Sequence, residues 1–217
     1  MKLIKQSFEI LDFPQNLNLI EFAGRTCYKS TYRIEEDSAK GFVQKLMASG
    51  HESVLEHDKI SVLLITNRAI THEIVRHRIA SFSQESTRYC NYSKDRFGGL
   101  TFIIPEWSGL QEQEIDSKEV LKFVDTDSTC FTWMRSMAYA ERAYLSLLSE
   151  GKTPQQARGV LPNDLKTEIV VTANIREWRL IMKQRTAKAA HPQMRELMIA
   201  LLTEFKEKSI LFDDIRA

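Results

Sequence analysis

The chain has 217 residues and a mass of 25.1 kDa, which predicts a single domain because globular domains usually hold about 100–200 residues. Apolar residues make up 43% and charged residues 27% of the sequence, as in an ordinary globular protein. The 30 basic and 29 acidic residues leave a net charge of +1, which disfavours a strongly basic nucleic-acid binder and an acidic tail protein.

Cysteine content and hydropathy indicate the cellular compartment in which the protein is expected. Cys27, Cys90 and Cys130 are odd in number and form no CxxC pair, so we expect neither a disulfide framework nor a zinc ribbon, and a reducing, cytoplasmic location. No stretch reaches the roughly 18 consecutive apolar residues that would predict a membrane span. The N-terminal segment lacks the apolar core of a signal peptide.

The N-terminal quarter predicts one strand and two helices. Residues 2–11 alternate apolar and polar side chains, which predicts a strand that Pro14 closes. Residues 17–28 predict a helix with an apolar stripe of Leu19, Ile20, Phe22 and Ala23. Residues 36–48 predict a second helix, with Gly50 as its C-cap.

The next segment combines a strand, a helix and polar loops. Residues 50–53 predict a polar loop, and residues 59–65 are rich in β-branched side chains, which is typical of a buried strand. Thr66 is expected to cap a helix over residues 67–78. Residues 81–97 are polar and predict an irregular segment.

The C-terminal half contains a long helical region. Residues 118–150 have helical periodicity and end at Gly151. The other expected elements are a strand over 100–105, a loop over 106–117, a short helix over 154–160, a strand over 166–173, and helices over 175–186 and 192–207. Because strands and helices alternate irregularly, we predict an α+β fold with a mixed or antiparallel sheet and flanking helices.

Short motifs for dinucleotides and metals are absent from the sequence. The glycines form no GxGxxG, so the fold is predicted to be non-Rossmann. Gly151-Lys152-Thr153 resembles the end of a P-loop, but we interpret it as a helix end because the first glycine of that motif is missing. The five histidines form no HExxH, and we expect no metal site.

The densest polar segment runs from Arg76 to Tyr89. Arginines lie near both of its ends, and small hydrogen-bonding side chains lie between them, which suits a phosphate or an oxygen-rich heterocycle. Ser86 has no GxSxG context, so we interpret it as a ligand contact and not a nucleophile. Cys90 is the alternative nucleophile, although a buried, inert thiol is the commoner case.

Three motifs together resemble one enzyme family. Arg76-His77-Arg78 is followed by seven residues and then Ser86. A Gly50-His51-Glu52-Ser53 segment lies upstream, and Asn174-Ile175-Arg176 with Arg185 lies downstream. This pattern resembles the flavin-dependent thymidylate synthases over residues 20–206, and the resemblance implies one such domain over residues 1–217.

The resemblance implies a reaction and an assembly. The methylene of methylenetetrahydrofolate is transferred to dUMP, FAD is the hydride carrier, and NADPH is the reductant. No enzyme nucleophile takes part. The implied assembly is a homotetramer with active sites shared between subunits, with neither nucleic acid nor membrane as a partner.

The resemblance also implies roles for individual residues. Arg185 is the expected catalytic residue, because an arginine can stabilise a uracil anion without losing its proton. The expected FAD contacts are His51, Ser53, Arg76, His77, Arg78, Gln84, Asn174, Arg176, Leu180 and His191. The expected dUMP contacts are Glu73, Arg76, Gln84, Glu85, Ser86, Thr87, Arg88, Arg158 and Arg185. Many relatives have Glu where this chain has Gln84, which keeps an acceptor but loses the charge.

Helical geometry links two of these residues. Asn174 and Arg185 are eleven positions apart, which is about 20° past three full turns of a continuous helix. One helix is therefore expected to touch flavin at one end and nucleotide at the other.

Three alternative functions remain open from the residues. The first is an RNA-binding module with a basic and aromatic patch of Arg76, Arg78, Arg88, Lys94, Arg96, Phe82, Tyr89 and Tyr92. The second is a folate-dependent synthase without flavin that uses Cys90 as its nucleophile. The third is a structural oligomer with a degraded site.

Overall fold

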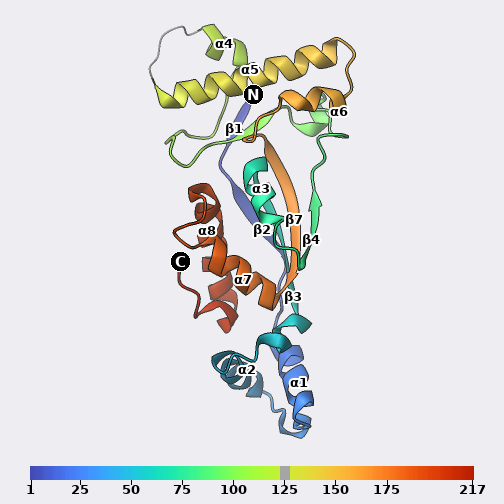
Figure 1. Ribbon diagram of the computed structural model, residues 1–217, viewed down its shortest axis with the longest axis vertical. Coiled ribbons are helices and arrows are strands. Elements are labelled where there is room, and N and C mark those ends of the chain that lie inside the picture. Colours follow the sequence, from blue (N-terminus) through green and yellow to red (C-terminus); the bar gives the residue numbers. More distant parts are fainter. Residues whose placement is uncertain (123–127) are drawn as a thin grey trace. The chain divides into compact units, whose positions relative to one another are not determined.

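The computed structural model describes residues 1–122 and 128–217 and confirms the α+β fold (Figure 1). The chain divides into two compact units, each built from three segments. Unit 1 comprises Met1–Ser7, Leu64–Ile74 and Ser83–Ile169, and unit 2 comprises Phe8–Leu63, Val75–Phe82 and Val170–Ala217.

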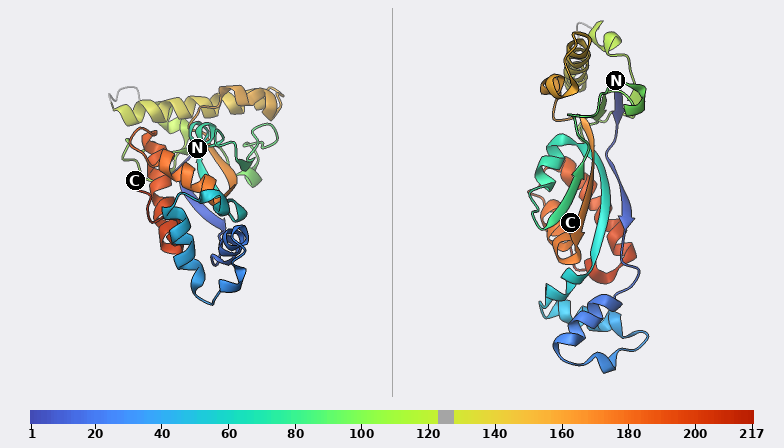
Figure 2. Two further views of the ribbon diagram at one scale, coloured as in Figure 1. Left: turned by 60° about the horizontal axis from the view of Figure 1, so that its bottom comes forward. Right: turned by 90° about the vertical axis from the view of Figure 1, so that its right-hand side faces the viewer.

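A four-stranded sheet has the order β2-β3-β7-β4, and its strands lie side by side in Figure 2. Its members are β2 (Ser7–Asp12), β3 (Lys59–Asn67), β7 (Lys166–Asn174) and β4 (Ala80–Gln84). Along β3 every second side chain from Ile60 is buried, and along β7 the same holds from Thr167. The β-branched and aliphatic residues of these strands therefore form the interior face, as the sequence predicts for 59–65 and 166–173.

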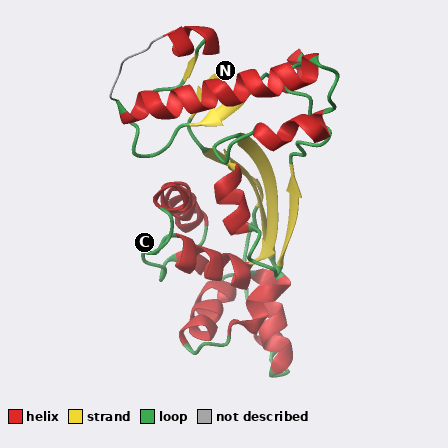
Figure 3. Cartoon of the chain, turned by 45° about the horizontal axis from the view of Figure 1, so that its top comes forward, coloured by secondary structure: helices red, strands yellow, loops and turns green. Residues whose placement is uncertain are grey.

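Unit 1 contains a second sheet and the longest helix. The strands β1 (Lys2–Ile4), β5 (Thr101–Ile103) and β6 (Gln113–Glu114) pair in the order β5-β1-β6, with β1 parallel to β5 and Leu3 opposite Phe102. The helices of unit 1, all drawn in red in Figure 3, are α3 (Arg68–Ile74), α4 (Ser117–Lys122), α5 (Thr129–Ser149) and α6 (Pro154–Ala157).

The core of unit 1 forms where α5 meets the small sheet. Trp133, Met137 and Tyr144 recur at helical spacing on one face of α5 and join Leu3 and Phe102 in one buried cluster. Burial of this face explains why the sequence of this region has helical periodicity. The predicted helix over 118–150 is divided into α4 and α5, and its residues 123–127 lie outside the described residues.

Unit 2 packs its helices around aromatic side chains. Its helices are α1 (Asn18–Cys27), α2 (Ser38–Ala48), α7 (Ile175–Arg185) and α8 (Pro192–Lys208). The ring of Phe205 lies 5.4 Å from that of Trp178 and 4.8 Å from that of Phe212. The indole of Trp178 also donates to the carbonyl of Ile60 at 2.9 Å, so α7 is fixed to β3.

Two N-terminal predictions are wrong in detail. The strand predicted over 2–11 is two strands in different sheets, because the amide of Lys5 donates to the Glu112 carboxylate at 2.8 Å instead of to a neighbouring strand. The predicted apolar stripe of α1 is only partly buried, because Ile20 is fully buried whereas Leu19 is 50% and Phe22 55% accessible. The helix also buries Glu21, whose carboxylate accepts from Arg25 and Ser38.

Gly50 and Gly151 each end a helix, as the sequence predicts. Gly50 has φ +73° and its amide donates to the Met47 carbonyl, so it ends α2 as predicted. Gly151 has φ +84°, and Thr153 forms a capping box with Gln156, which confirms a helix end and not a P-loop.

The helix predicted over 67–78 is shorter than expected. Asn67, not Thr66, accepts from the amide of Ile70 at 2.9 Å, so it is the residue that caps α3. The helix ends at Ile74, and Arg76, His77 and Arg78 therefore lie in the turn before β4. The segment predicted as irregular begins with this strand, because its residues pair with β7.

Candidate functional site

The predicted site residues fall into two groups, one in each unit. The first group lies around α7 in unit 2 and contains Arg76, His77, Arg78, Asn174, Arg176, Leu180 and Arg185. The second lies in unit 1, at the end of β4 and in the segment that follows it, together with one later arginine, and contains Gln84, Glu85, Ser86, Thr87, Arg88 and Arg158. The predicted convergence of Arg76 and Arg185 with Arg88 stays a prediction, because Arg88 belongs to the other unit.

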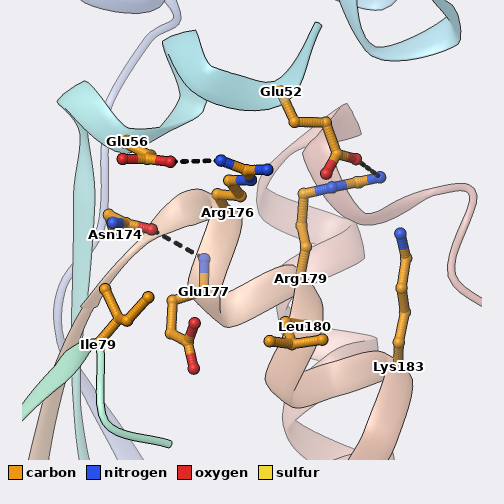
Figure 4. Close-up of a pocket in the computed structure, with 9 residues that line it drawn as sticks. All are labelled: Glu52, Glu56, Ile79, Asn174, Arg176, Glu177, Arg179, Leu180 and Lys183. Atoms are coloured by element: carbon orange, nitrogen blue, oxygen red, sulfur yellow. Dashed lines mark hydrogen bonds and ion pairs between the residues drawn. The ribbon is translucent and has the colours of Figure 1, made fainter. Parts of the chain in front are cut away.

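A cleft of about 420 Å³ opens at the N-terminus of α7 (Figure 4). Its lining, here called the Asn174 cleft, consists of Glu52, Glu56, Ile79, Asn174, Arg176, Glu177, Arg179, Leu180 and Lys183. Asn174 caps the helix by accepting from the amide of Glu177 at 2.8 Å. The exposed guanidinium of Arg176 donates to Glu56, another residue of the cleft lining, at 2.6 Å.

Arg179 fixes the wall of the Asn174 cleft. Its buried guanidinium donates to both carboxylate oxygens of Asp214, at 2.7 and 2.8 Å, and to Glu52 at 3.3 Å. It also donates to the carbonyl of Leu211. The guanidinium of Arg179 lowers the pKa of Asp214 below its ordinary value, chiefly through the hydrogen bond that it donates to the Asp214 carboxylate. Arg179 therefore ties the segment after α8 and residue Glu52 to α7.

A second cleft, of about 300 Å³, lies at the other end of α7. Its lining, here called the His77 cleft, consists of Arg76, His77, Arg78, Ile79, Glu177, Leu180, Gln184 and Arg185. The two clefts share Ile79, Glu177 and Leu180. Ile79 is 69% and Leu180 42% exposed, so two apolar side chains lie open between two groups of cations.

The end of α7 meets the turn after α3 at His77. The Nε of Arg185 donates to His77 Nε2 at 3.0 Å, and His77 Nδ1 lies 3.2 Å from a Glu177 carboxylate oxygen. Burial, followed by the charge of Arg185, lowers the pKa of His77 below the ordinary histidine value. The imidazole is therefore neutral at pH 7 and joins the predicted catalytic arginine to the Arg76–Arg78 turn.

In unit 1 the amide of Gln84 has a defined orientation. Its Nε2 donates to the hydroxyls of Thr71 at 2.9 Å and Thr167 at 3.2 Å. The Thr71 hydroxyl donates its own proton to the carbonyl of Arg68 at 3.0 Å, so it can only accept from Gln84. This fixes the amide so that both N–H bonds are used within the chain, and the carbonyl oxygen is the group available to a ligand.

Glu85 is held by its neighbours in the same unit. One carboxylate oxygen accepts from the buried Tyr92 hydroxyl at 2.6 Å and the other from Lys166 at 3.1 Å. The backbone amide of Glu85 donates to the carbonyl of Glu168 at 2.9 Å. These three contacts position the start of the loop that follows β4.

That loop brings two arginines to one turn. The carbonyl of Ser86 accepts from the amides of Tyr89 and Cys90, which closes the turn. Arg158 donates to the hydroxyl of Thr87 at 3.3 Å, and Arg88 donates to Gln155 at 2.9 Å. Two exposed cations beside small hydroxyl groups form an arrangement suited to a phosphate.

Comparison with known proteins gives the family. Residues 9–209 match the family model described as thymidylate synthase complementing protein. A flavin-dependent thymidylate synthase of Mycobacterium bovis (strain BCG / Pasteur 1173P2) is 33% identical over 193 residues, which cover 86% of this chain and 74% of the relative. The chain belongs to the flavin-dependent thymidylate synthase family. The enzyme of Pyrococcus furiosus is 32% identical over 199 residues, covering 91% of this chain and 73% of that protein.

Solved structures support the fold. A UMP/dUMP methylase, PolB, from Streptomyces cacaoi bound with 5-Br dUMP has a TM-score of 0.75 at 21% identity, over 99% of this chain and 96% of that chain. The structure of the same protein bound with 5-Br UMP gives a TM-score of 0.74. The chain therefore shares its α+β fold with PolB, and this is not a Rossmann fold. Membership in the synthase family makes the chain an enzyme of the methyltransferase class.

Family membership also bears on the alternatives. A flavin-dependent thymidylate synthase is an enzyme, so the RNA-binding module and the degraded structural oligomer are not supported. Tyr92, a member of the supposed RNA-binding patch, is buried. Burial, and then the charge of Glu85, raise the pKa of Cys90 above its ordinary value, which disfavours the thiolate that a nucleophile requires.

Four predicted site residues have no place in these arrangements. His191 caps α8, where its Nδ1 accepts from the amide of Gln193 at 3.2 Å. His51 and Ser53 are exposed at and near the start of a short 3-10 helix over Glu52–His57, where the sequence predicted a loop. Glu73 lies on α3 in unit 1, whereas His77 belongs to unit 2. Their assigned contacts stay predictions.

Sequence reasoning missed Glu177, Arg179 and Lys166 as members of the site. Glu177 at the third helical position after Asn174 is a recognisable signal, since an acidic residue is favoured in a first turn. Within residues 1–122 and 128–217 no group of three or more His, Cys, Asp or Glu side chains is arranged to hold a metal ion. Across the same residues, none of the helices has the length and apolar character needed to cross a membrane.

Proposed function

We propose that this enzyme reductively methylates dUMP to dTMP, with methylenetetrahydrofolate as carbon donor, FAD as hydride carrier and NADPH as reductant. The observation that carries this proposal is the contact between Arg185 and the neutral His77. It joins the first motif of the family to the arginine at the end of α7. The 5-Br dUMP bound to PolB supports a uracil nucleotide as the substrate.

The two clefts along α7 fit a flavin dinucleotide. Such a group combines flat rings with a diphosphate, and these clefts combine open apolar side chains with cations. Ile79 and Leu180 supply the apolar surface. Arg76 and Arg78 supply positive charge, as does Arg176, whose guanidinium is paired with Glu56. We assign the FAD contacts to these residues together with His77 and Asn174, with His51, Ser53, Gln84 and His191 as further contacts.

The turn after β4 fits the phosphate and sugar of dUMP. Arg88 and Arg158 are exposed cations that can each donate several N–H bonds to a phosphate. Ser86 and Thr87 provide hydroxyls, and Gln84 presents a fixed carbonyl acceptor. Glu73, Glu85, Arg76 and Arg185 complete the proposed dUMP contacts.

Arg185 is the proposed catalytic residue. Addition of hydride to a uracil ring develops negative charge on the ring oxygen and nitrogen. An arginine keeps its proton at every working pH, so it stabilises that charge without taking part in proton transfer. The protein orients and polarises the uracil ring, while the flavin, when bound, supplies the hydride. The raised pKa of the Cys90 thiol supports a direct route without an enzyme nucleophile.

We further propose a homotetramer whose active sites are shared between subunits. Both substrates and the cofactor are anionic, whereas each chain has a net charge of only +1. Arginines contributed by several chains would concentrate positive charge where the ligands bind. Light scattering should give the mass of four chains, and a monomer that retains full flavin binding would contradict this assembly.

Isotope transfer tests the function. The flavin-loaded enzyme is reduced with the nicotinamide cofactor in D2O, where the exchangeable N5 proton of the reduced flavin is replaced by deuterium, and is then mixed with dUMP and methylenetetrahydrofolate for a single turnover in D2O. Deuterium in the product methyl group is the expected result. Formation of dTMP without deuterium in its methyl group, or no dTMP at all, would contradict the proposal.

A further inference from the structure

A buried carboxylate, that of Glu177, is connected to the proposed catalytic residue Arg185 through His77. Glu177 is only 6% exposed, and the roles implied for this chain by its family motifs do not include it. One of its oxygens lies 3.2 Å from His77 Nδ1, and the opposite ring nitrogen of His77 accepts from Arg185. The three side chains therefore form one line, from Glu177 through His77 to Arg185.

The chemistry of the three groups fixes the position of each proton. A guanidinium can only donate hydrogen bonds, so His77 Nε2 must be the unprotonated nitrogen. A neutral imidazole carries its proton on the other nitrogen, so Nδ1–H donates to the Glu177 carboxylate. The carboxylate and Arg185 therefore favour the same tautomer, in which His77 donates from Nδ1 and accepts at Nε2.

The helix cannot provide this connection by itself. Glu177 and Arg185 are eight positions apart on α7, which corresponds to a rise of about 12 Å and about 80° past two turns. His77 comes from a separate segment and spans this gap. The cap of Asn174 on the Glu177 amide fixes the carboxylate end of the line.

We propose that Glu177 is a positioning residue for Arg185 and acts through the tautomer and orientation of His77. This inference rests on the catalytic role proposed above for Arg185. Without the carboxylate, the imidazole is free to carry its proton on Nε2, where it faces the donor of Arg185. The guanidinium then loses the hydrogen bond that its Nε donates to His77.

This arrangement predicts a specific dependence on pH. The charged groups that line the His77 cleft are Arg76, Arg78, Glu177 and Arg185. Protonation of His77 places a proton on Nε2 and removes the acceptor for Arg185, so activity is lost as the pH falls through the pKa of His77. The carboxylate of Glu177 raises that pKa, against the larger lowering by burial and Arg185. Removing its charge therefore moves the acid limb to lower pH.

The test compares Glu177→Ala and Glu177→Gln with the unmodified enzyme. The exposed Glu204 on α8 provides the control variant Glu204→Ala. Imidazole ¹⁵N shifts report the tautomer of His77, and kcat and KM for dUMP are measured across the acid range. Thermal unfolding identifies any variant that has failed to fold.

In Glu177→Ala we expect loss of the Nδ1–H tautomer and a fall in kcat of about 10-fold to 100-fold, the usual effect of losing a charged hydrogen bond. Glu177→Gln keeps an acceptor and should recover part of this loss, with an acid limb at lower pH than in the unmodified enzyme. Glu204→Ala should change neither measurement.

Two outcomes distinguish failure of the Glu177 inference from failure of the proposed function. An unchanged tautomer and an unchanged acid limb in both Glu177 variants would overturn the inference, even if the enzyme makes dTMP. The expected ¹⁵N shifts in an enzyme that makes no dTMP would leave the line of three side chains in place and contradict the proposed function.

Discussion

The two groups of site residues differ in how their polar side chains are used. In unit 1 the polar side chains at the end of β4 and just after it are held by other groups of the chain. Gln84 is held by Thr71 and Thr167, and Glu85 by Tyr92 and Lys166. In unit 2 the arginines Arg76, Arg78 and Arg176 are exposed along the clefts of α7.

This difference indicates two kinds of preorganisation. The unit 1 loop presents groups whose orientation the chain has already fixed, so ordering them on ligand binding costs little entropy. The α7 clefts present exposed cations, such as Arg176, whose guanidinium donates to Glu56. Substitutions in the two regions should therefore have different consequences for kcat and for binding.

The largest effect is expected for Arg185→Ala. Removing a donor that stabilises charge in the transition state should lower kcat by about 10²-fold to 10³-fold. Binding of dUMP, measured by equilibrium dialysis, should weaken much less than kcat falls. Lys208→Ala, at an exposed position on α8, is the charge-matched control. Equal losses in dUMP affinity and kcat would show that Arg185 only binds the nucleotide.

A smaller effect is expected for Thr71→Val in unit 1. The substitution keeps the size of a fully buried side chain but removes the hydroxyl that orients Gln84. Losing a buried hydrogen-bond partner should lower the free energy of unfolding by about 1–3 kcal/mol, measured by urea denaturation. The KM for dUMP should rise while kcat changes little, because the freed amide can turn.

Thr203→Val is the matched control for that variant. Thr203 is an exposed threonine on α8 whose hydroxyl donates to the Ile199 carbonyl, so its loss should leave KM unchanged. If Thr71→Val destabilises the protein but leaves the KM for dUMP unchanged, Gln84 does not contact the nucleotide.

The smallest effect is expected for Asp214→Asn, which concerns stability in acid. Arg179 lowers the pKa of Asp214 in the folded chain, so this carboxylate stabilises the fold above the ordinary aspartate pKa of 3.8. That contribution is lost as the pH falls below 3.8 and through the lower folded pKa. Melting temperatures measured from about pH 7 to pH 2 should therefore fall less steeply in the variant. An unchanged slope would mean that the pair adds nothing measurable, as is common for half-exposed ion pairs.

Elements with strong local signals were predictable. The strands β3 and β7 are runs of β-branched residues, and α5 repeats its apolar residues at helical spacing, so their type follows from the sequence. The end of α2 followed from Gly50, because few other residues accept its positive φ. The family motifs, which are readable as fixed patterns in the sequence, were enough to place Arg76, His77, Arg78 and Arg185 among the expected functional residues.

Tertiary structure decided the remaining features, because each depends on partners far away in the sequence. Glu21 is buried on α1 beside Ile20 because Ser38 and Arg25 satisfy its charge. Glu177 meets His77 from a position 100 residues away, and Gln84 acquires a fixed amide only from Thr71 and Thr167. Hydrogen bonds over such separations leave no periodicity in the sequence, so only the folded chain shows which polar side chains orient one another.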